Sequence, residues 1–275
     1  MGNVLLGATA LLCGCNAIFG LEETRLVDGP RAGCPDPSTT APAFGRSPRP
    51  VVLGKNAAWY GFGDSRQLAI LYGLAGTKLT ILEGVVDEAA VSPPAGLAIG
   101  EGTMPRLAPE SDQLLVRAST TSFEIYERFG TQWNKLGTLG IPVTANHQLS
   151  APSRLVDGTR HIIVNTTDEL HEYVGSSTEP WRRVATYTRF QLGLDPQLLL
   201  ATPNLTPDGL RLVFRTSRGL AYADRAGIEA PFGTARDVVL DVPDVNTPHL
   251  LEDCSRLYFS IVTAEGDLGV YFVEP

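Results

Sequence analysis

Four stretches of the chain repeat one pattern of apolar and polar positions. Each begins at a proline, continues through a short apolar stretch and a polar turn, and then enters an unbroken apolar run. The leading residues are Pro105, Pro152, Pro203 and Pro248, spaced 47, 51 and 45 residues apart. Self-similarity at a period of this size indicates repeated copies of one supersecondary unit.

Turn chemistry and apolar runs predict that each unit is built of strands. Asp157-Gly158 and Asp208-Gly209 supply the residue that bonds its own backbone and the residue that tolerates positive φ. The runs after the turns are continuously apolar, which is typical of strands buried on both faces. These predicted central strands are Leu114–Val116, Ile162–Val164, Leu212–Phe214 and Leu257–Phe259.

Further β-like runs follow in each unit, which brings the predicted count to four short strands. Four strands per unit of about 45 residues is typical of the blade of a β-propeller. An earlier, more divergent unit fits residues 57–82. The last unit ends at Pro275 after three strands, so we expect residues near Pro50 to Leu53 to supply its fourth strand and close the ring. The predicted fold is an all-β propeller of about five blades, with six left open.

One repeat resembles a known family. The segment from Pro203 to Phe214, with its Thr206-Pro207-Asp208-Gly209 turn, followed by Leu220-Ala221-Tyr222, looks like the TolB-type, WD-like β-propeller repeat. The match is partial in the units at Pro105, Pro152 and Pro248. The resemblance implies a propeller fold and export, and it implies no particular chemistry, because propellers host binding modules and unrelated enzymes alike.

The amino terminus has the pattern of an export signal. Val4–Leu12 is a short apolar run, too short to cross a bilayer stably, and it leads into Cys13-Gly14-Cys15. Leu12 to Cys15 resembles the bacterial lipobox, which implies lipidation of Cys15 and removal of residues 1–14. A plain signal peptide or a misassigned start is the alternative. Asn16 after the cysteine points, by resemblance to the enterobacterial sorting rule, to the outer membrane.

Residues 15–50 read as a lipidated flexible tether, because 29–50 is rich in Pro, Gly, Ser and Thr and lacks hydrophobic periodicity. The predicted propeller therefore spans residues 51–275. After processing and acylation, Cys34 and Cys254 remain, and in an oxidising compartment two cysteines suggest a disulfide. Such a bond would fasten the tether to the last repeat; the alternative is that both thiols stay free.

Composition changes the picture in two ways. The 28 glycines and 20 prolines in 275 residues agree with many turns. The net charge of −8, with no cluster of Lys and Arg, argues against a nucleic-acid partner.

Candidate site residues come from the repeat alignment. Arg106, Ser153, Asn204 and His249 occupy the position just after each leading proline, where they are predicted to line the mouth of a central channel; the alternative is that they only satisfy neighbouring backbone groups. His161 aligns with an apolar position and is expected to be a hydrogen-bonded core histidine. No histidine pair or cysteine motif has metal-ligand spacing, so neither metal nor cofactor is expected.

The chain carries none of the common catalytic motifs, and we expect it not to be an enzyme. The favoured interpretation is an exported lipoprotein, anchored in the membrane by acyl chains, whose propeller binds a protein, peptide or glycan of the envelope. The alternative is a carbohydrate-active hydrolase or lyase on the same scaffold, which would need two opposed carboxylates. A lipoprotein with a purely structural role is a third interpretation.

Overall fold

In the computed structural model, residues 44–51, 104–110, 112–130, 132–262 and 269–275 are described in full. For residues 57–62, 68–73, 78–83, 97–101, Thr103 and Leu268, the structure describes the strands and not the side chains. Contacts divide the chain into residues 1–32 and 33–275, and every described residue belongs to the second unit.

Every regular element that the structure describes is a strand, and the strands pair into four-stranded antiparallel sheets. Sheet 1 is β2 (Ala57–Phe62), β3 (Leu68–Gly73), β4 (Lys78–Glu83) and β5 (Leu97–Glu101). Sheet 2 is β6 (Thr103–Leu107), β7 (Gln113–Ser119), β8 (Ser122–Phe129) and β9 (Gln132–Thr138). Sheet 3 is β10 (Gln148–Leu149), β11 (Arg160–Asn165), β12 (Glu169–Gly175) and β13 (Arg182–Thr188). Sheet 4 is β14 (Ala201–Leu205), β15 (Arg211–Thr216), β16 (Gly219–Asp224) and β17 (Arg236–Val238), and sheet 5 is β18 (Val245–Leu250), β19 (Leu257–Val262), β20 (Leu268–Val273) and β1 (Arg49–Val51).

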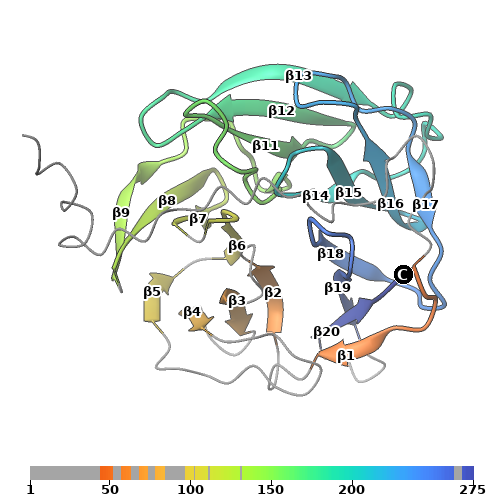
Figure 1. Ribbon diagram of the computed structural model, residues 1–275, viewed down its shortest axis with the longest axis horizontal. Coiled ribbons are helices and arrows are strands. Elements are labelled where there is room, and N and C mark those ends of the chain that lie inside the picture. Colours follow the sequence, from red (N-terminus) through yellow and green to blue (C-terminus); the bar gives the residue numbers. More distant parts are fainter. Residues whose placement is uncertain are drawn as a thin grey trace, which may run out of the picture. The chain divides into compact units, whose positions relative to one another are not determined.

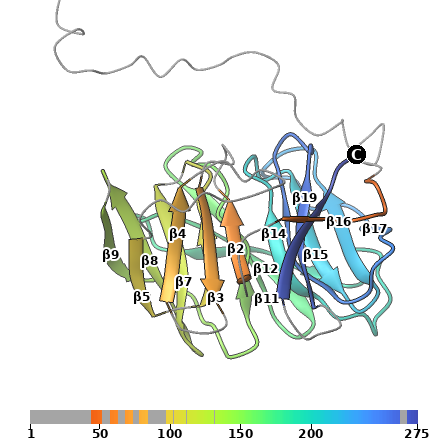
Figure 2. The same cartoon turned by 90° about the horizontal axis from the view of Figure 1, so that it is seen from below.

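The sheets are arranged radially around one axis (Figure 1). The first strand of each sheet is innermost, and these strands touch in the cyclic order β2, β6, β10, β14, β18 and back to β2. Radial repetition of four-stranded sheets defines a β-propeller, so the predicted all-β propeller fold is confirmed. In the view turned by 90°, the strands of neighbouring sheets stand side by side, which leaves their turns at two opposite faces (Figure 2).

The ring is closed by a strand from the other end of the sequence. β1 pairs antiparallel with β20, with Arg49 opposite Phe272 and Val51 opposite Val270. This confirms the expectation that the last unit borrows its fourth strand, although β1 begins two residues before the predicted start of the domain. Without β1, the hydrogen-bonding edge of β20 would be open to other chains.

A bulge recurs in three inner strands. Met104, Thr202 and Thr247 each have positive φ, each directly precedes a leading proline, and the strand register shifts at each. Proline has no N–H for the ladder and is therefore confined to edges and bulges. The leading prolines of β6, β14 and β18 thus mark places where the inner strand leaves regular pairing.

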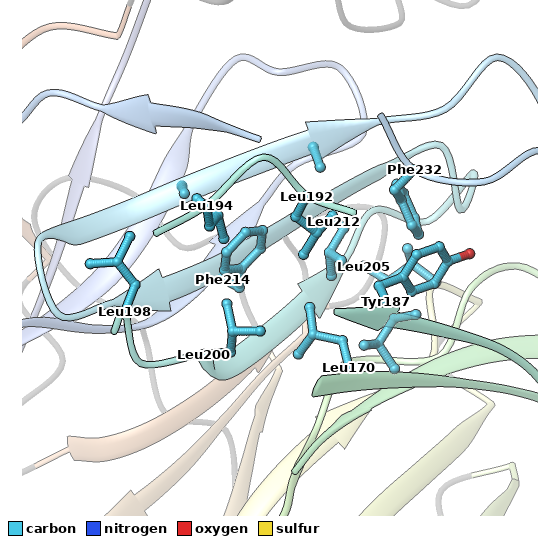
Figure 3. Close-up of a cluster of buried hydrophobic side chains, with 13 residues drawn as sticks. Leu170, Tyr187, Leu192, Leu194, Leu198, Leu200, Leu205, Leu212, Phe214 and Phe232 are labelled. Atoms are coloured by element: carbon cyan, nitrogen blue, oxygen red, sulfur yellow. The ribbon is translucent and has the colours of Figure 1, made fainter. Parts of the chain in front are cut away.

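The core lies between neighbouring sheets. β11 is buried at every residue, as the unbroken apolar run predicted. One cluster, drawn in Figure 3, joins Leu170 and Tyr187 of sheet 3 to Leu212 and Phe214 of sheet 4. Similar clusters join sheets 2 and 3, and sheets 4 and 5. Every described sheet therefore depends on its neighbours for burial of its apolar faces.

Candidate functional site

The four residues predicted to line the channel are placed close to the axis. Arg106, Asn204 and His249 lie on β6, β14 and β18, and Ser153 follows β10. Asn204 Nδ2 donates to His249 Nδ1 at 3.2 Å, so the structure brings these two together. Ser153 is engaged elsewhere: its Oγ accepts from the backbone N–H of His161 at 2.9 Å and donates to the carbonyl of Arg154.

These residues are packed and not solvated. All four are at most 6% exposed. Arg106 donates through Nε to the carbonyl of Leu149 at 2.5 Å, which ties β6 to β10. Burial, and then the positive charge of Arg106, lower the pKa of His249 to about 3, so the imidazole is neutral and accepts from Asn204. A ligand-binding role for this group stays a prediction.

A second polar cluster lies between sheets 3 and 4, and sequence reasoning missed it. Glu172 on β12 is 2% exposed and its carboxylate receives three donors from three different elements. Oε1 accepts from His161 Nδ1 at 2.6 Å and from Arg225 Nη1 at 2.9 Å, and Oε2 accepts from the Tyr187 hydroxyl at 2.6 Å. Because Arg225 lies in the connection between β16 and β17, the cluster links the two sheets.

The charges of this cluster are matched. Burial raises the pKa of Glu172, but the hydrogen bond from His161 and the charge of Arg225 outweigh it, so the pKa lies below its ordinary value. Burial and the neighbouring carboxylate raise the pKa of Tyr187, which stays a neutral donor. Removing one partner of a buried ion pair costs about 3–5 kcal/mol. Glu172 is therefore an ionised, fixed acceptor that orients the groups around it.

The cluster forms the floor of a cavity of about 160 Å³, which we call the Glu172 pocket. Half of its lining residues are apolar, and the lining includes one further carboxylate, Glu229. Figure 3 shows the Tyr187 ring beside Phe232, with its hydroxyl pointing away from the leucines of the core. The residues that line the pocket are His161, Glu172, Val184, Ala185, Tyr187, Arg225, Ile228, Glu229, Ala230 and Pro231.

Two groups of this pocket have hydrogen-bonding capacity to spare: Arg225, whose buried Nη2 has no partner within the described residues, and His161. Nδ1 of His161 bonds Glu172, while within the described residues Nε2 has no hydrogen-bond partner and is not among the buried polar atoms. With the proton on Nδ1, Nε2 presents a lone pair to the pocket. The expectation of a hydrogen-bonded core histidine is confirmed, and the same residue also lines a cavity.

The sequence held a signal for Glu172. Alternate residues of a strand share a face, so Glu172 had to lie on the same face as Leu170, which belongs to an apolar strand run. A carboxylate at a buried strand position requires partners. Arg225 and Tyr187 are distant in sequence, and no local pattern pointed to either.

The cysteine predictions fall largely outside the described residues, since Cys15 and Cys34 lie there. Cys254 is buried, and its sulfur accepts from Arg211 Nη1 at 2.8 Å. Among the residues that the structure describes, no group of three or more His, Cys, Asp or Glu side chains could hold a metal ion. The same residues include no helix long and apolar enough to span a bilayer.

Comparison with known proteins gives distant structural likenesses alone. No protein-family model matches the sequence, and no curated protein matches it. The periplasmic gluconolactonase PpgL of Pseudomonas aeruginosa is 11% identical, with 79% of this chain and 70% of that chain covered, at a TM-score of 0.44. TolB of Acinetobacter baumannii is 11% identical over 80% of this chain and 55% of its own, at 0.46. A Lactobacillus plantarum protein is 11% identical over 78% and 69%, also at 0.46. The fold assignment therefore rests on the sheet order of this chain.

The buried imidazole at the axis predicts an acid-sensitive fold. The pKa of His249 is about 3 in the folded chain against 6.5 ordinarily, so between these values the unfolded chain binds a proton that the folded chain does not. Stability should therefore fall as the pH falls from 6.5 toward 3, by up to about 1.4 kcal/mol per pH unit. Urea unfolding at pH 7, 6, 5 and 4 measures this slope. His249→Gln should flatten it while His171→Gln should not, and equal slopes in all three proteins would refute the assignment.

Proposed function

We propose that this protein is an exported lipoprotein whose propeller serves as a binding module. The proposed propeller is a ring of five blades, in which sheet 1 is the first blade. The Glu172 pocket is the observation that carries the proposal. Apolar walls with a few fixed polar groups are the usual make-up of small-molecule sites. At about 160 Å³ the pocket suits one compact group and not a whole drug-sized ligand.

A sugar unit of an envelope glycan fits this chemistry. A pyranose ring offers C–H faces to apolar walls such as Val184 and Pro231, and hydroxyl donors to an acceptor such as His161 Nε2. Hydrogen bonds to Glu172 fix the side chains of His161 and Tyr187, so neither can rotate away from such a ligand. Preorganisation of this kind lowers the entropy cost of binding.

One observation favours the alternative, a carbohydrate-active hydrolase or lyase. A carboxylate that holds imidazole Nδ1 and leaves Nε2 facing a cavity is the arrangement of an oriented general base. Glu229 at the rim would be the second carboxylate that glycoside hydrolysis requires. Binding without turnover remains the favoured proposal, because Glu172 itself is ionised and saturated with donors.

Saturation-transfer NMR of the mature protein in detergent with soluble muropeptides tests both functions in one sample. Val184 and Val156 are both 42% exposed, but only Val184 lines the pocket. We expect transfer to sugar protons in the wild type and in Val156→Trp, and its loss in Val184→Trp, which fills the pocket. Absence of transfer to the wild type would reject the glycan proposal. New reducing ends that disappear in His161→Asn would establish the hydrolase instead.

The anchoring part of the proposal rests on the sequence. The lipobox-like segment ending at Cys15 supports an acyl anchor and an outer-membrane location. Cys254 is assigned as disulfide-bonded, which supports a bond from the last sheet to the tether, and we propose Cys34 as its partner. A covalent link of this kind would restrain the chain just before β1.

Intact mass spectrometry of the membrane fraction tests this part. The expected species starts at Cys15, carries acyl chains, and takes up alkylating reagent at Cys34 and Cys254 only after reduction. Cys15→Ser should abolish acylation, and the exposed Ser47→Ala should process normally. A chain that begins at Met1 with thiols open to alkylation before reduction would overturn both the anchor and the disulfide.

A further inference from the structure

Two arginines occupy equivalent positions in sheets 2 and 4. Arg117 on β7 lies opposite Thr103, and Arg215 on β15 lies opposite Ala201. In both cases the opposing residue immediately precedes the positive-φ residue of the inner-strand bulge. The two side chains therefore leave the backbone at equivalent positions of the sheet. Differences in their hydrogen bonding come from the connections that surround them.

The guanidinium of Arg117 is saturated. Arg117 is 7% exposed and fastens the turn between β7 and β8 to the connection between β9 and β10. Its acceptors are the carbonyls of Ser119, Thr120, Thr144, Ala145 and His147, at 2.7 to 3.2 Å, and the sulfur of Met104 at 3.6 Å. In sheet 2, carbonyl groups of the connection between β9 and β10 accept hydrogen bonds from the guanidinium of Arg117.

Arg215 has no such cover. Residues 239–244, which join β17 to β18, form a shorter connection than residues 139–147 of sheet 2. Within the described part of the chain, the side chain of Arg215 makes no hydrogen bond or ion pair. A cavity of about 180 Å³ is lined by residues 215–219 and by residues 242–245. We call this cavity the Arg215 pocket.

The donors of the Arg215 pocket come from the end of β15 and from the turn that follows it. Arg218 lines the same cavity, and its ion pair with Asp237, at 3.4 Å between two half-exposed side chains, is weak. Ser217 adds a hydroxyl, while Thr216 Oγ1 is already used within the turn, donating to the Gly219 carbonyl. Asp244 is the one acidic side chain in the lining, and Asp237, the partner of Arg218, lies outside it, so the guanidinium of Arg215 is the cation of this pocket that no ion pair engages in the described part of the chain.

We infer that the Arg215 pocket binds a phosphate or sulfate group. A single guanidinium already satisfies a planar carboxylate in bidentate fashion, whereas two guanidiniums and a hydroxyl together offer enough donors for a tetrahedral oxyanion. This site goes beyond the proposed glycan function and is independent of it. β16 runs from Gly219 at the Arg215 pocket to Asp224 beside the Glu172 pocket, so the two sites lie at opposite ends of one strand.

Isothermal titration of the mature protein in detergent with inorganic phosphate tests the inference. Wild type should bind, and Arg215→Gln should bind at least about tenfold more weakly, as expected when charge-assisted hydrogen bonds are removed. Arg183→Gln, which removes an exposed cation from β13 outside the pocket, should leave the affinity unchanged. Arg215→Lys, which keeps the charge, should retain intermediate affinity, and thermal midpoints would verify that each variant folds.

Three results would overturn the inference: no phosphate binding by the wild type, equal loss in Arg183→Gln, or acetate binding as tightly as phosphate. The source of the oxyanion is separated by a second titration with glycerophosphoglycerol, the headgroup of an anionic phospholipid. Tighter binding of inorganic phosphate supports a free anion as the ligand, and tighter binding of the diester supports a lipid headgroup. Muropeptide binding at the Glu172 pocket should be unaffected by Arg215→Gln, so the two proposals fail separately.

Discussion

Pairing of β1 with β20 is the constraint on which the rest of the molecule depends. A propeller sheet buries its apolar faces against its two neighbours, and hydrophobic clusters of this kind join sheets 2 and 3, 3 and 4, and 4 and 5. Sheet 5 has three strands of its own, and β1 completes it from the opposite end of the chain. Val51 is buried in this joint, and Arg49 forms an ion pair with Glu274 beside it. The ring is thus closed by a contact between residues far apart in sequence, and contacts of this kind slow folding.

In the part of the chain that the structure describes, polar clusters occur at the axis, between sheets and at the ends of strands. The inner strands approach closely enough to bury Arg106, Asn204 and His249 at the axis. Farther out, radial sheets diverge, and the space between them is filled by apolar residues, by a charge cluster at Glu172, or by the connections. Where a connection is short, as after β17, a cavity remains.

Repeats can therefore share a backbone and differ in chemistry. Arg117 and Arg215 occupy the same register position, yet Arg117 bonds carbonyl groups of a neighbouring connection, whereas Arg215 lines a cavity. The difference arises from connections whose lengths and sequences are not part of the repeat. Loops that vary on a common scaffold are the usual carriers of function.

The sequence predicted the repeated part well and the irregular part poorly. The unbroken apolar runs located β7, β11, β15 and β19, and the three-strand ending of the last unit located β1, because periodicity and burial are local properties. The apolar run Val238 to Val242 predicted the fourth strand of sheet 4 too late in the chain, since β17 is Arg236–Val238 and residues 239–244 form the connection to β18. The partners of Glu172 come from β11, β13 and the β16–β17 connection, and such convergence is set by tertiary packing.

Hydrogen exchange of the mature protein tests ring closure most directly. Val51→Asp places an unpaired charge in the buried joint between β1 and β20, and Ser47→Asp adds the same charge at an exposed position just before it. Closure by β1 predicts that amides of β20 lose protection in Val51→Asp, with the thermal midpoint lowered, while Ser47→Asp behaves as the wild type. Protection of β20 that is unchanged in Val51→Asp would contradict it.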